Sequence, residues 1–159
     1  MIDHPLHPAV VHFPIALLMT AVFFELAGLW GRRDLFRQFG FWLLALGLVA
    51  GVVSAGVGFW VHEAVEKSGV PEEAVDRHES LAVATLITFA VLMGYRRWAR
   101  DRWTVRHQSL YSVLALAGAI LLALTGYFGG DLVYQYGAGV QKTAPGSSVS
   151  PVAPPPVKD

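Results

Sequence analysis

Four apolar stretches, separated by short polar segments, constrain this chain more than any other feature. Three of them reach the ~20 mainly apolar residues that a helix needs to cross a bilayer. The third along the chain is shorter, but Pro71 followed by Glu72 and Glu73 is a favourable helix start, because carboxylates suit the positive end of a helix dipole. The pattern predicts an all-α fold, an integral-membrane four-helix bundle. Its helices are expected at about residues 10–30, 39–62, 72–97 and 108–128.

The composition agrees with a membrane protein. Hydrophobic residues make up 54% of the 159 residues and charged residues only 15%, against roughly 25% in soluble domains. The chain has no cysteine, which excludes disulfides, iron–sulfur ligation and thiolate zinc sites. It has no nucleotide-binding loop, nucleophile elbow or zinc-protease motif, so we do not expect an enzyme in its own right.

Basic residues gather around two of the three loops. Eight of the twelve lysines and arginines lie around the loops after the first and third helices, whereas residues 61–80 between them are mainly acidic. Because short arginine-rich loops stay in the cytoplasm, we expect a bacterial cytoplasmic (inner) membrane protein with both termini in the periplasm. The arginines at residues 96–106 alternate with Trp98 and Trp103, but topology and anionic lipid explain them better than nucleic acid.

The chain is expected to end in two parts that do not span the membrane. The stretch GGDLVYQYGAGV at residues 129–140 is polar and glycine-rich, so we expect it to fold back as a lid over the periplasmic mouth of the bundle. Residues 141–159 are rich in proline, which predicts a disordered tail. The four-helix domain therefore covers residues 1–140.

Histidines concentrate at the periplasmic end of the predicted bundle. Five of the six fall there, on three different helices, and only His107 lies in a cytoplasmic loop. His4 and His7 each precede a proline, which disfavours the α conformation, so we expect both in an extended lead-in. The five histidines of the periplasmic end are His4, His7, His12, His62 and His78.

A b-type haem is one cofactor that such histidines can hold. It needs an axial imidazole from each of two helices and an apolar slot between them. His12 and His78 fit best, because both lie near the periplasmic edge of the apolar layer, on the first and third helices. Phe13 would wall the ring, Arg77 would pair with a propionate, and Tyr134 is a further expected cofactor-binding residue.

Two other interpretations stay open. A copper or zinc ion could use the same imidazoles, with His7 and His62 as alternative ligands and nearby carboxylates completing the shell. Alternatively, the histidines cap helix ends or face water in a cofactor-free structural subunit. A haem requires a flat apolar slot, whereas an ion requires carboxylates among the imidazoles, and the sequence supplies both.

Glu25 is an acid placed inside the first apolar stretch, five residues before Trp30. Acids inside a membrane are costly and often functional. At this depth we favour snorkelling of the side chain toward Arg32 or Arg33. The alternative is a proton or cation path that uses Glu25 and the periplasmic histidines.

Three segments together resemble one family. HPLHPAVVHFPIALL at residues 4–18, RHESLA at 77–82 and the stretch at 129–140 are similar to the bacterial four-helix membrane proteins catalogued as domain of unknown function 2231. The resemblance implies a four-helix membrane fold. It also implies an association with redox proteins, because family members occur beside cytochrome c or Rieske-type modules. Many relatives have a histidine where this chain has Tyr136. The family positions in this chain are His7, His12, His78, Gly129, Gly130, Leu132, Val133, Tyr134, Gly137, Gly139 and Val140.

These patterns predict a small electron-transfer module that holds haem b near the periplasmic face. It would exchange electrons with a periplasmic partner, a cytochrome c or a Rieske-type protein, docked over the lid that contains Tyr134. His7 and His62 would support the axial pair or replace one of its members.

Overall fold

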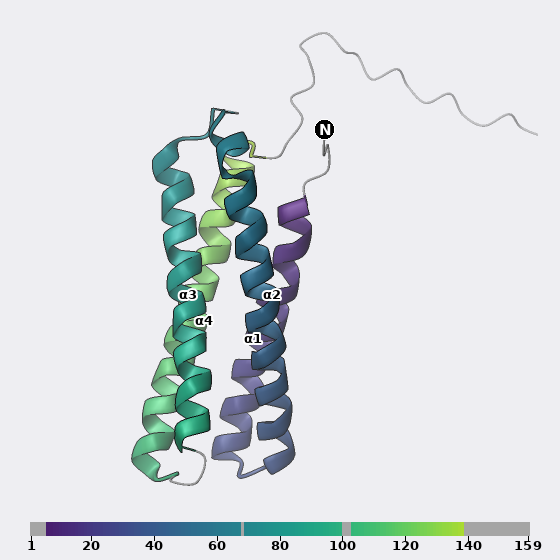
Figure 1. Ribbon diagram of the computed structural model, residues 1–159. Helices are drawn as coiled ribbons and strands as arrows, with labels where there is room; N and C mark the ends of the chain where they lie inside the picture. Colours follow the sequence, from purple (N-terminus) through teal and green to yellow (C-terminus); the bar gives the residue numbers. More distant parts are fainter. Residues whose placement is uncertain (1–5, 68, 100–102, 139–159) are drawn as a thin grey trace, which may run out of the picture.

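The computed structural model describes residues 6–67, 69–99 and 103–138, which form four long helices and, within these residues, no strand. The helices are α1 (Leu6–Trp30), α2 (Asp34–Lys67), α3 (Glu72–Ala99) and α4 (Val105–Tyr134). They alternate in direction, so the start of α1, the turn between α2 and α3 and the end of α4 lie at one end of the bundle (Figure 1). All four are long and apolar enough to cross a membrane. The predicted membrane four-helix bundle is therefore confirmed.

The start of α3 follows the sequence signals closely. The helix begins at Glu72, with Glu72 and Glu73 in its first turn. The carbonyl oxygen of Pro71 accepts hydrogen bonds from the amides of Ala74 and Val75, at 3.0 and 3.3 Å. Gly69, in the turn before it, has a φ of 93°, a conformation that glycine adopts without the steric cost of a side chain.

The start of α1 differs from the expected extended lead-in. The helix begins at Leu6, so the backbone of His7 is helical although proline follows it. Amides in the first turn of a helix have no acceptor within that helix, so Pro8 removes nothing that the helix needs there. His4 lies outside the described residues.

The end of the bundle also differs from the expected lid. Residues 129–134 continue α4, and residues 135–138 form the turn that ends it. Gly137, with a φ of 70°, donates its amide to the carbonyl of Val133 at 3.0 Å, and Ala138 donates to Leu132 at 2.8 Å. The first of these bonds is that of an αL-type helix end, in which a glycine takes the left-handed position and donates to the carbonyl four residues earlier. Residues 139–159, which include the expected tail, lie outside the described residues.

The four helices pack as two hairpins. α1 packs most extensively against α2, and α3 against α4, whereas α1 and α3 lie diagonally opposite each other. The backbones of the first hairpin approach closely at glycines of α2: a Cβ at Gly47 would lie 2.7 Å from Leu18 Cδ2 and 3.2 Å from Leu18 N. Small residues of this kind let membrane helices approach each other.

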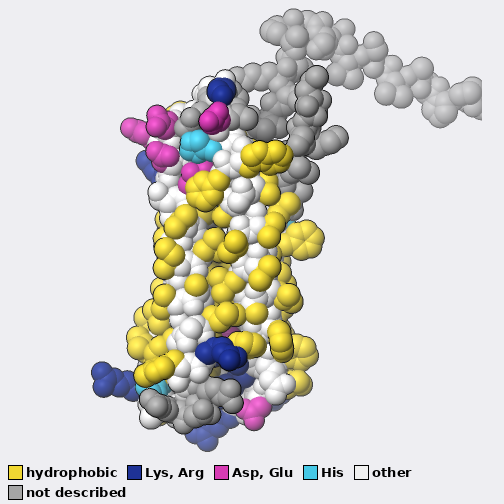
Figure 2. Space-filling model, in the orientation of Figure 1, with side chains coloured by type: hydrophobic (Ala, Val, Ile, Leu, Met, Phe, Trp, Pro, Cys, Tyr) yellow, Lys and Arg dark blue, Asp and Glu magenta, His cyan; other side chains and the backbone are white. Residues whose placement is uncertain are grey.

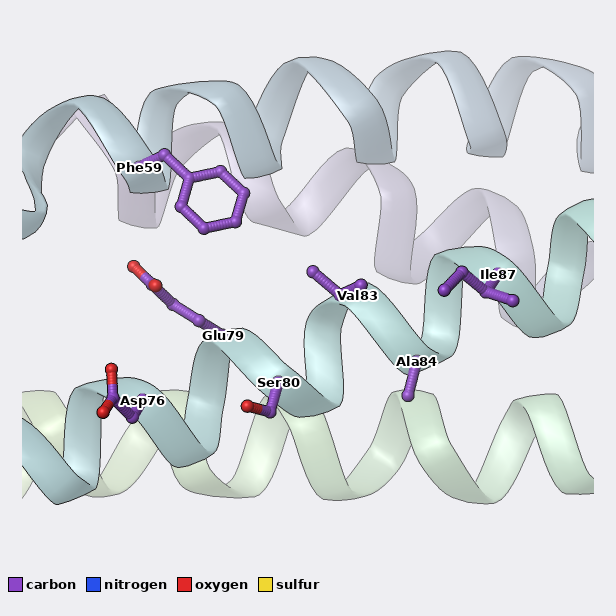
Figure 3. Close-up of a pocket in the computed structure, with 7 residues that line it drawn as sticks. All are labelled: Phe59, Asp76, Glu79, Ser80, Val83, Ala84 and Ile87. Atoms are coloured by element: carbon purple, nitrogen blue, oxygen red, sulfur yellow. The ribbon is translucent and has the colours of Figure 1, made fainter.

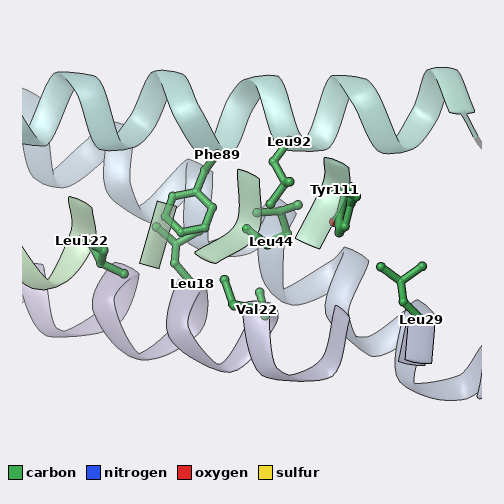
Figure 4. Packing of buried hydrophobic residues seen from close by; sticks show 10 residues of the cluster. Leu18, Val22, Leu29, Leu44, Phe89, Leu92, Tyr111 and Leu122 are labelled. Carbon is green, nitrogen blue, oxygen red and sulfur yellow. The ribbon is translucent and has the colours of Figure 1, made fainter. Parts of the chain in front are cut away.

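Large apolar side chains from all four helices fill the centre of the bundle. Leu18, Leu44, Phe89 and Tyr111 are among the fully buried members of this core (Figure 4). Many other large apolar side chains point outward, and they cover the middle of the bundle in Figure 2. A surface of this kind suits lipid rather than water, since the lipid tails are as apolar as the side chains.

Candidate functional site

Polar side chains gather at the two ends of the bundle and differ in kind. Figure 2 shows most of the acidic side chains at the end where α3 begins, and most of the basic ones at the opposite end. We call the first the histidine end, because His62 and His78 lie there, and the second the arginine end, after Arg37 and Arg96.

His78, in the second turn of α3, is held against α4. Its Nδ1 lies 3.1 Å from the carbonyl oxygen of Thr125. A carbonyl oxygen only accepts, so Nδ1 carries the hydrogen and the lone pair of the neutral ring is on Nε2. A Cβ at Gly129 would lie 2.9 Å from His78 Cε1 and 3.2 Å from Nδ1, so only a glycine leaves enough space for the imidazole ring in this position. This close approach of the His78 ring is a physical reason for the first glycine of the GGDLVY segment.

Two threonines strengthen the same contact between α3 and α4. The hydroxyl oxygens of Thr85 and Thr125 lie 3.0 Å apart. Each also lies within hydrogen-bond distance of the carbonyl four residues earlier, 2.7 Å to Leu81 and 2.8 Å to Leu121. These bonds fix the backbone of α4 where it supplies the acceptor for His78.

His62 makes a separate contact, between α2 and α3. Its Nδ1 lies 2.8 Å from Glu79 Oε1, and both side chains are partly exposed. A shallow groove runs beside this pair, and Phe59 of α2 faces Glu79 and Val83 of α3 across it (Figure 3). The groove is lined by carboxylates and apolar groups and by no imidazole among the described side chains, so it does not bring the histidines together.

The other residues of the predicted haem site are spread around the histidine end. The side chain of His12 is exposed on α1. Phe13 and Tyr134 are 67% and 91% exposed, so neither lines an interior slot. Arg77 is exposed on α3, and its Cζ lies 5.4 Å from the centre of the Phe128 ring. The structure thus places these side chains on the outside of the bundle.

The register of the helices relates the histidines of α1 to His78. A Cβ at Gly51 would lie 2.5 Å from Leu86 Cδ2 and 3.8 Å from Pro14 Cβ, so Leu86 and Pro14 lie at about the same level. His78 precedes Leu86 by eight residues and His7 precedes Pro14 by seven. α1 and α3 run in the same direction, so at about 1.5 Å per residue the backbones of His7 and His78 are level, and His12 lies about 9 Å deeper.

Potential ligands for a small metal ion are dispersed. Among the residues whose side chains the structure describes, no three of His, Asp or Glu are close enough together to hold an ion. The side chain of His7 lies outside this set. His107 lies at the arginine end, where the centre of its ring is 6.1 Å from that of Tyr95 and 5.9 Å from that of Trp98, both in edge-on contacts.

Glu25 forms the second site, and its partner corrects the expectation of snorkelling. The side chain is fully buried. Arg96 of α3 donates from Nη1 to Glu25 Oε2 and from Nη2 to the carbonyl oxygen of Arg37 on α2, the latter at 2.6 Å. A Cβ at Gly40 would lie 2.7 Å from Glu25 Oε1, so a glycine of α2 makes room for the carboxylate. Glu25 therefore turns into the bundle and not toward Arg32 or Arg33.

Further hydrogen bonds join α4 to this end. Gln108 Nε2 donates to the carbonyl oxygen of Leu29 at 2.7 Å, and Trp30 Nε1 donates to Ser112 Oγ at 3.1 Å. Polar bonds at the arginine end therefore reach all four helices. Five buried polar atoms have no hydrogen-bond partner among the described residues, and all five belong to side chains of this end. They are Glu25 Oε1, Arg37 Nε, Tyr95 Oη, Trp103 Nε1 and Tyr111 Oη.

Sequence reasoning singled out Glu25 but missed its partner. The position of each residue along its helix would have predicted the pair. Glu25 lies five residues before the end of α1, and Arg96 lies three residues before the end of α3. Because both helices run in the same direction, the two residues are almost level. Two opposite charges at one depth in different helices predict a pair across the bundle.

Comparison with known proteins identifies the family. The model of the family described as "Predicted membrane protein (DUF2231)" matches residues 3–142, which is most of the chain. The chain therefore belongs to this family, as its motifs had indicated. No curated protein and no solved structure matches it.

Proposed function

We propose that this family member is a small electron-transfer protein of the membrane that binds haem b at its histidine end, with His78 as one axial ligand. The hydrogen bond from His78 Nδ1 to the carbonyl oxygen of Thr125 carries the proposal. Histidines that bind metals usually donate their other ring nitrogen to a carbonyl or carboxylate, which fixes the tautomer and the orientation of the ring. In His78 this arrangement leaves the lone pair on Nε2, the atom that would bind iron.

The second axial ligand that we propose is His7, in place of His12. The backbone of His7 is level with that of His78, whereas His12 lies about 9 Å deeper and its side chain is exposed. A b-type haem held in this way would take one imidazole from each of two helices. Helices α1 and α3, which are diagonal neighbours in the bundle, are suited to supply them.

We propose haem rather than copper or zinc because it needs fewer protein ligands. A haem iron takes two protein ligands at most, whereas a structural ion site takes three or four. Ligands of the second kind do not gather among the described side chains. When bound, the haem would supply reversible one-electron transfer, and the protein would hold its iron, cover its ring and pair its propionates, for which Arg77 at the rim is available.

The acidic surface of the histidine end suggests which partner would dock there. Exposed carboxylates surround the entrance to α3, and a basic patch on a redox partner would complement them. This supports a periplasmic cytochrome c or Rieske-type protein as the partner. The proposed orientation in a bacterial inner membrane rests on the arginine-rich loops of the opposite end, because such loops stay on the cytoplasmic side. The chain would not be an enzyme by itself. The exposed carboxylates are Glu63, Glu72, Glu73 and Asp76.

Optical spectra of the full chain test the proposal. The protein would be expressed with a haem supply, purified in detergent and measured oxidised and reduced. We expect a Soret band, with sharp α and β bands on reduction, that is lost in His78→Ala and in His7→Ala. The bands should persist in His12→Ala and in His107→Ala, the control at the opposite end.

Three results would contradict it in whole or in part. A colourless wild-type protein, or a spectrum that His78→Ala leaves unchanged, would overturn the haem assignment. Loss of the bands in His12→Ala with retention in His7→Ala would overturn the choice of the second ligand. Far-ultraviolet circular dichroism of each variant would separate loss of a ligand from loss of the fold.

A further inference from the structure

A recess at the arginine end, between the start of α2 and the end of α3, is lined by basic and aromatic side chains. It lies at the opposite end of the bundle from the proposed haem site and does not depend on that proposal. Its lining consists of Arg37, Gln38, Phe41 and Trp42 of α2, Arg96 and Arg97 of α3, and Trp103 from the segment before α4.

Two hydrogen-bond donors of this lining are buried without an acceptor. Arg37 Nε and Trp103 Nε1 have no hydrogen-bond partner within the described part of the chain. The two side chains are in contact, because Arg37 Cζ lies 5.1 Å from the centre of the Trp103 ring. A buried N–H that lacks an acceptor is costly, so a small movement of these two half-buried side chains that brings both donors to the oxygens of one anion would be favourable.

The recess also carries excess positive charge. Arg96 is neutralised by Glu25. No described acidic side chain forms an ion pair with Arg37 or Arg97. Guanidinium groups recognise phosphate through paired, charge-assisted hydrogen bonds, and a buried indole N–H can add a third donor.

Aromatic side chains place the recess at the level of lipid headgroups. Trp42, on its rim, is 64% exposed, and Trp30 and Trp98 are exposed at the same end. Tryptophans gather at the boundary between the apolar layer and water. A phosphate in the recess would therefore lie at the depth at which phospholipids carry theirs.

We propose that this recess binds the phosphate group of an anionic phospholipid, with Arg37 and Trp103 as the donors and Arg97 as the nearby positive charge. Free phosphate offers the same oxygens, but only a lipid also provides acyl chains that can lie along the apolar faces of α2 and α3. The proposed ligand is thus a membrane lipid bound at one defined position.

Native mass spectrometry of the full chain in detergent, titrated with phosphatidylglycerol, tests this assignment. We expect Arg37→Gln and Trp103→Phe each to weaken lipid binding roughly tenfold, because each removes a hydrogen bond to a charged group. Arg106→Gln is the matched control, since it removes the same charge from an exposed position at the same end outside the recess. It should weaken binding by less than about twofold. Phosphatidylcholine and inorganic phosphate serve as the comparison ligands.

Equal losses in Arg37→Gln and Arg106→Gln would show general attraction between charges and would overturn the site. Binding that Trp103→Phe leaves unchanged would also overturn it, and this variant retains the aromatic ring that packs beside Arg37. Displacement of the lipid by millimolar inorganic phosphate would overturn the lipid as ligand. Equal affinity for phosphatidylcholine would contradict the requirement for a net negative headgroup.

Discussion

The two ends of the bundle differ in how their polar bonds connect the helices. At the arginine end, the hydrogen bonds made by Glu25, Arg96, Gln108 and Trp30 reach all four helices, and the carboxylate of Glu25 is fully buried. At the histidine end, the hydrogen bonds of His62, His78 and Thr85 join α2 to α3 and α3 to α4, and the charged groups there are exposed or half-buried. The arginine end is thus built to hold the fold together, whereas the histidine end presents oriented side chains near the surface.

The difference between the two ends depends on the ion pair between Glu25 and Arg96. We expect Glu25→Ala to destabilise the protein by about 3 kcal/mol, because Arg96, whose side chain is 12% exposed, would lose the charge that balances it. Unfolding in detergent, followed by tryptophan fluorescence, would measure the loss. Glu63→Ala, which removes an exposed ion pair with Lys67 at the histidine end, is the control and should change little. A loss in Glu25→Ala as small as the control's would remove the distinction between the ends.

Replacing both members of the pair sharpens the same prediction. Glu25→Leu combined with Arg96→Met should recover much of the stability lost in Glu25→Ala, because no isolated charge then remains in the bundle. If the double variant is as unstable as the single one, the cost arises from packing and not from charge.

Close packing around Glu25 gives the next largest effect. We expect Gly40→Ala to cost about 1–3 kcal/mol, because the new Cβ would lie within 3 Å of Glu25 Oε1, Cγ and N. Gly126→Ala is the matched control, since a Cβ there meets nothing within 4 Å. The same unfolding measurement applies. An equal response of the two variants would contradict the close approach of α1 and α2.

A smaller effect is expected for the glycine that accommodates His78. Gly129→Ala should cost about 1 kcal/mol, because a side-chain ring can move aside more easily than a backbone, with loss of one hydrogen bond. Gly130→Ala is the control, since its nearest neighbour would be 4.0 Å away. Nitrogen-15 NMR of the imidazole groups would detect the lost bond as a change at His78 Nδ1. An unchanged His78 signal in Gly129→Ala would contradict the contact.

Local signals in the sequence predicted the helices because the membrane makes them strong. Long apolar stretches specify spanning helices whatever their neighbours are, and Pro71 with two glutamates fixes the start of α3. The end of α4 was missed for the opposite reason. Gly129 and Gly130 disfavour a helix intrinsically, but packing of His78 from another helix outweighs that propensity. The glycine that does end the helix is Gly137.

The candidate sites depended more on contacts between helices. The placement of His12, His62 and His78 toward one end of the bundle followed from topology, so the sequence was sufficient to predict it. The partners of His62 and His78 are a carboxylate and a backbone carbonyl on neighbouring helices, and neither follows from spacing along the chain. The difference in depth between His7 and His12 needed the register between α1 and α3, which the contacts of Gly51 provide.

The two members of the ion pair across the bundle are synthesised at different times. Glu25 leaves the ribosome 71 residues before Arg96, so the first hairpin enters the membrane with an acid whose partner has not yet been synthesised. An unpaired carboxylate in lipid is costly. Synthesis of the second hairpin therefore supplies the charge that balances Glu25 and stabilises the hairpin already inserted.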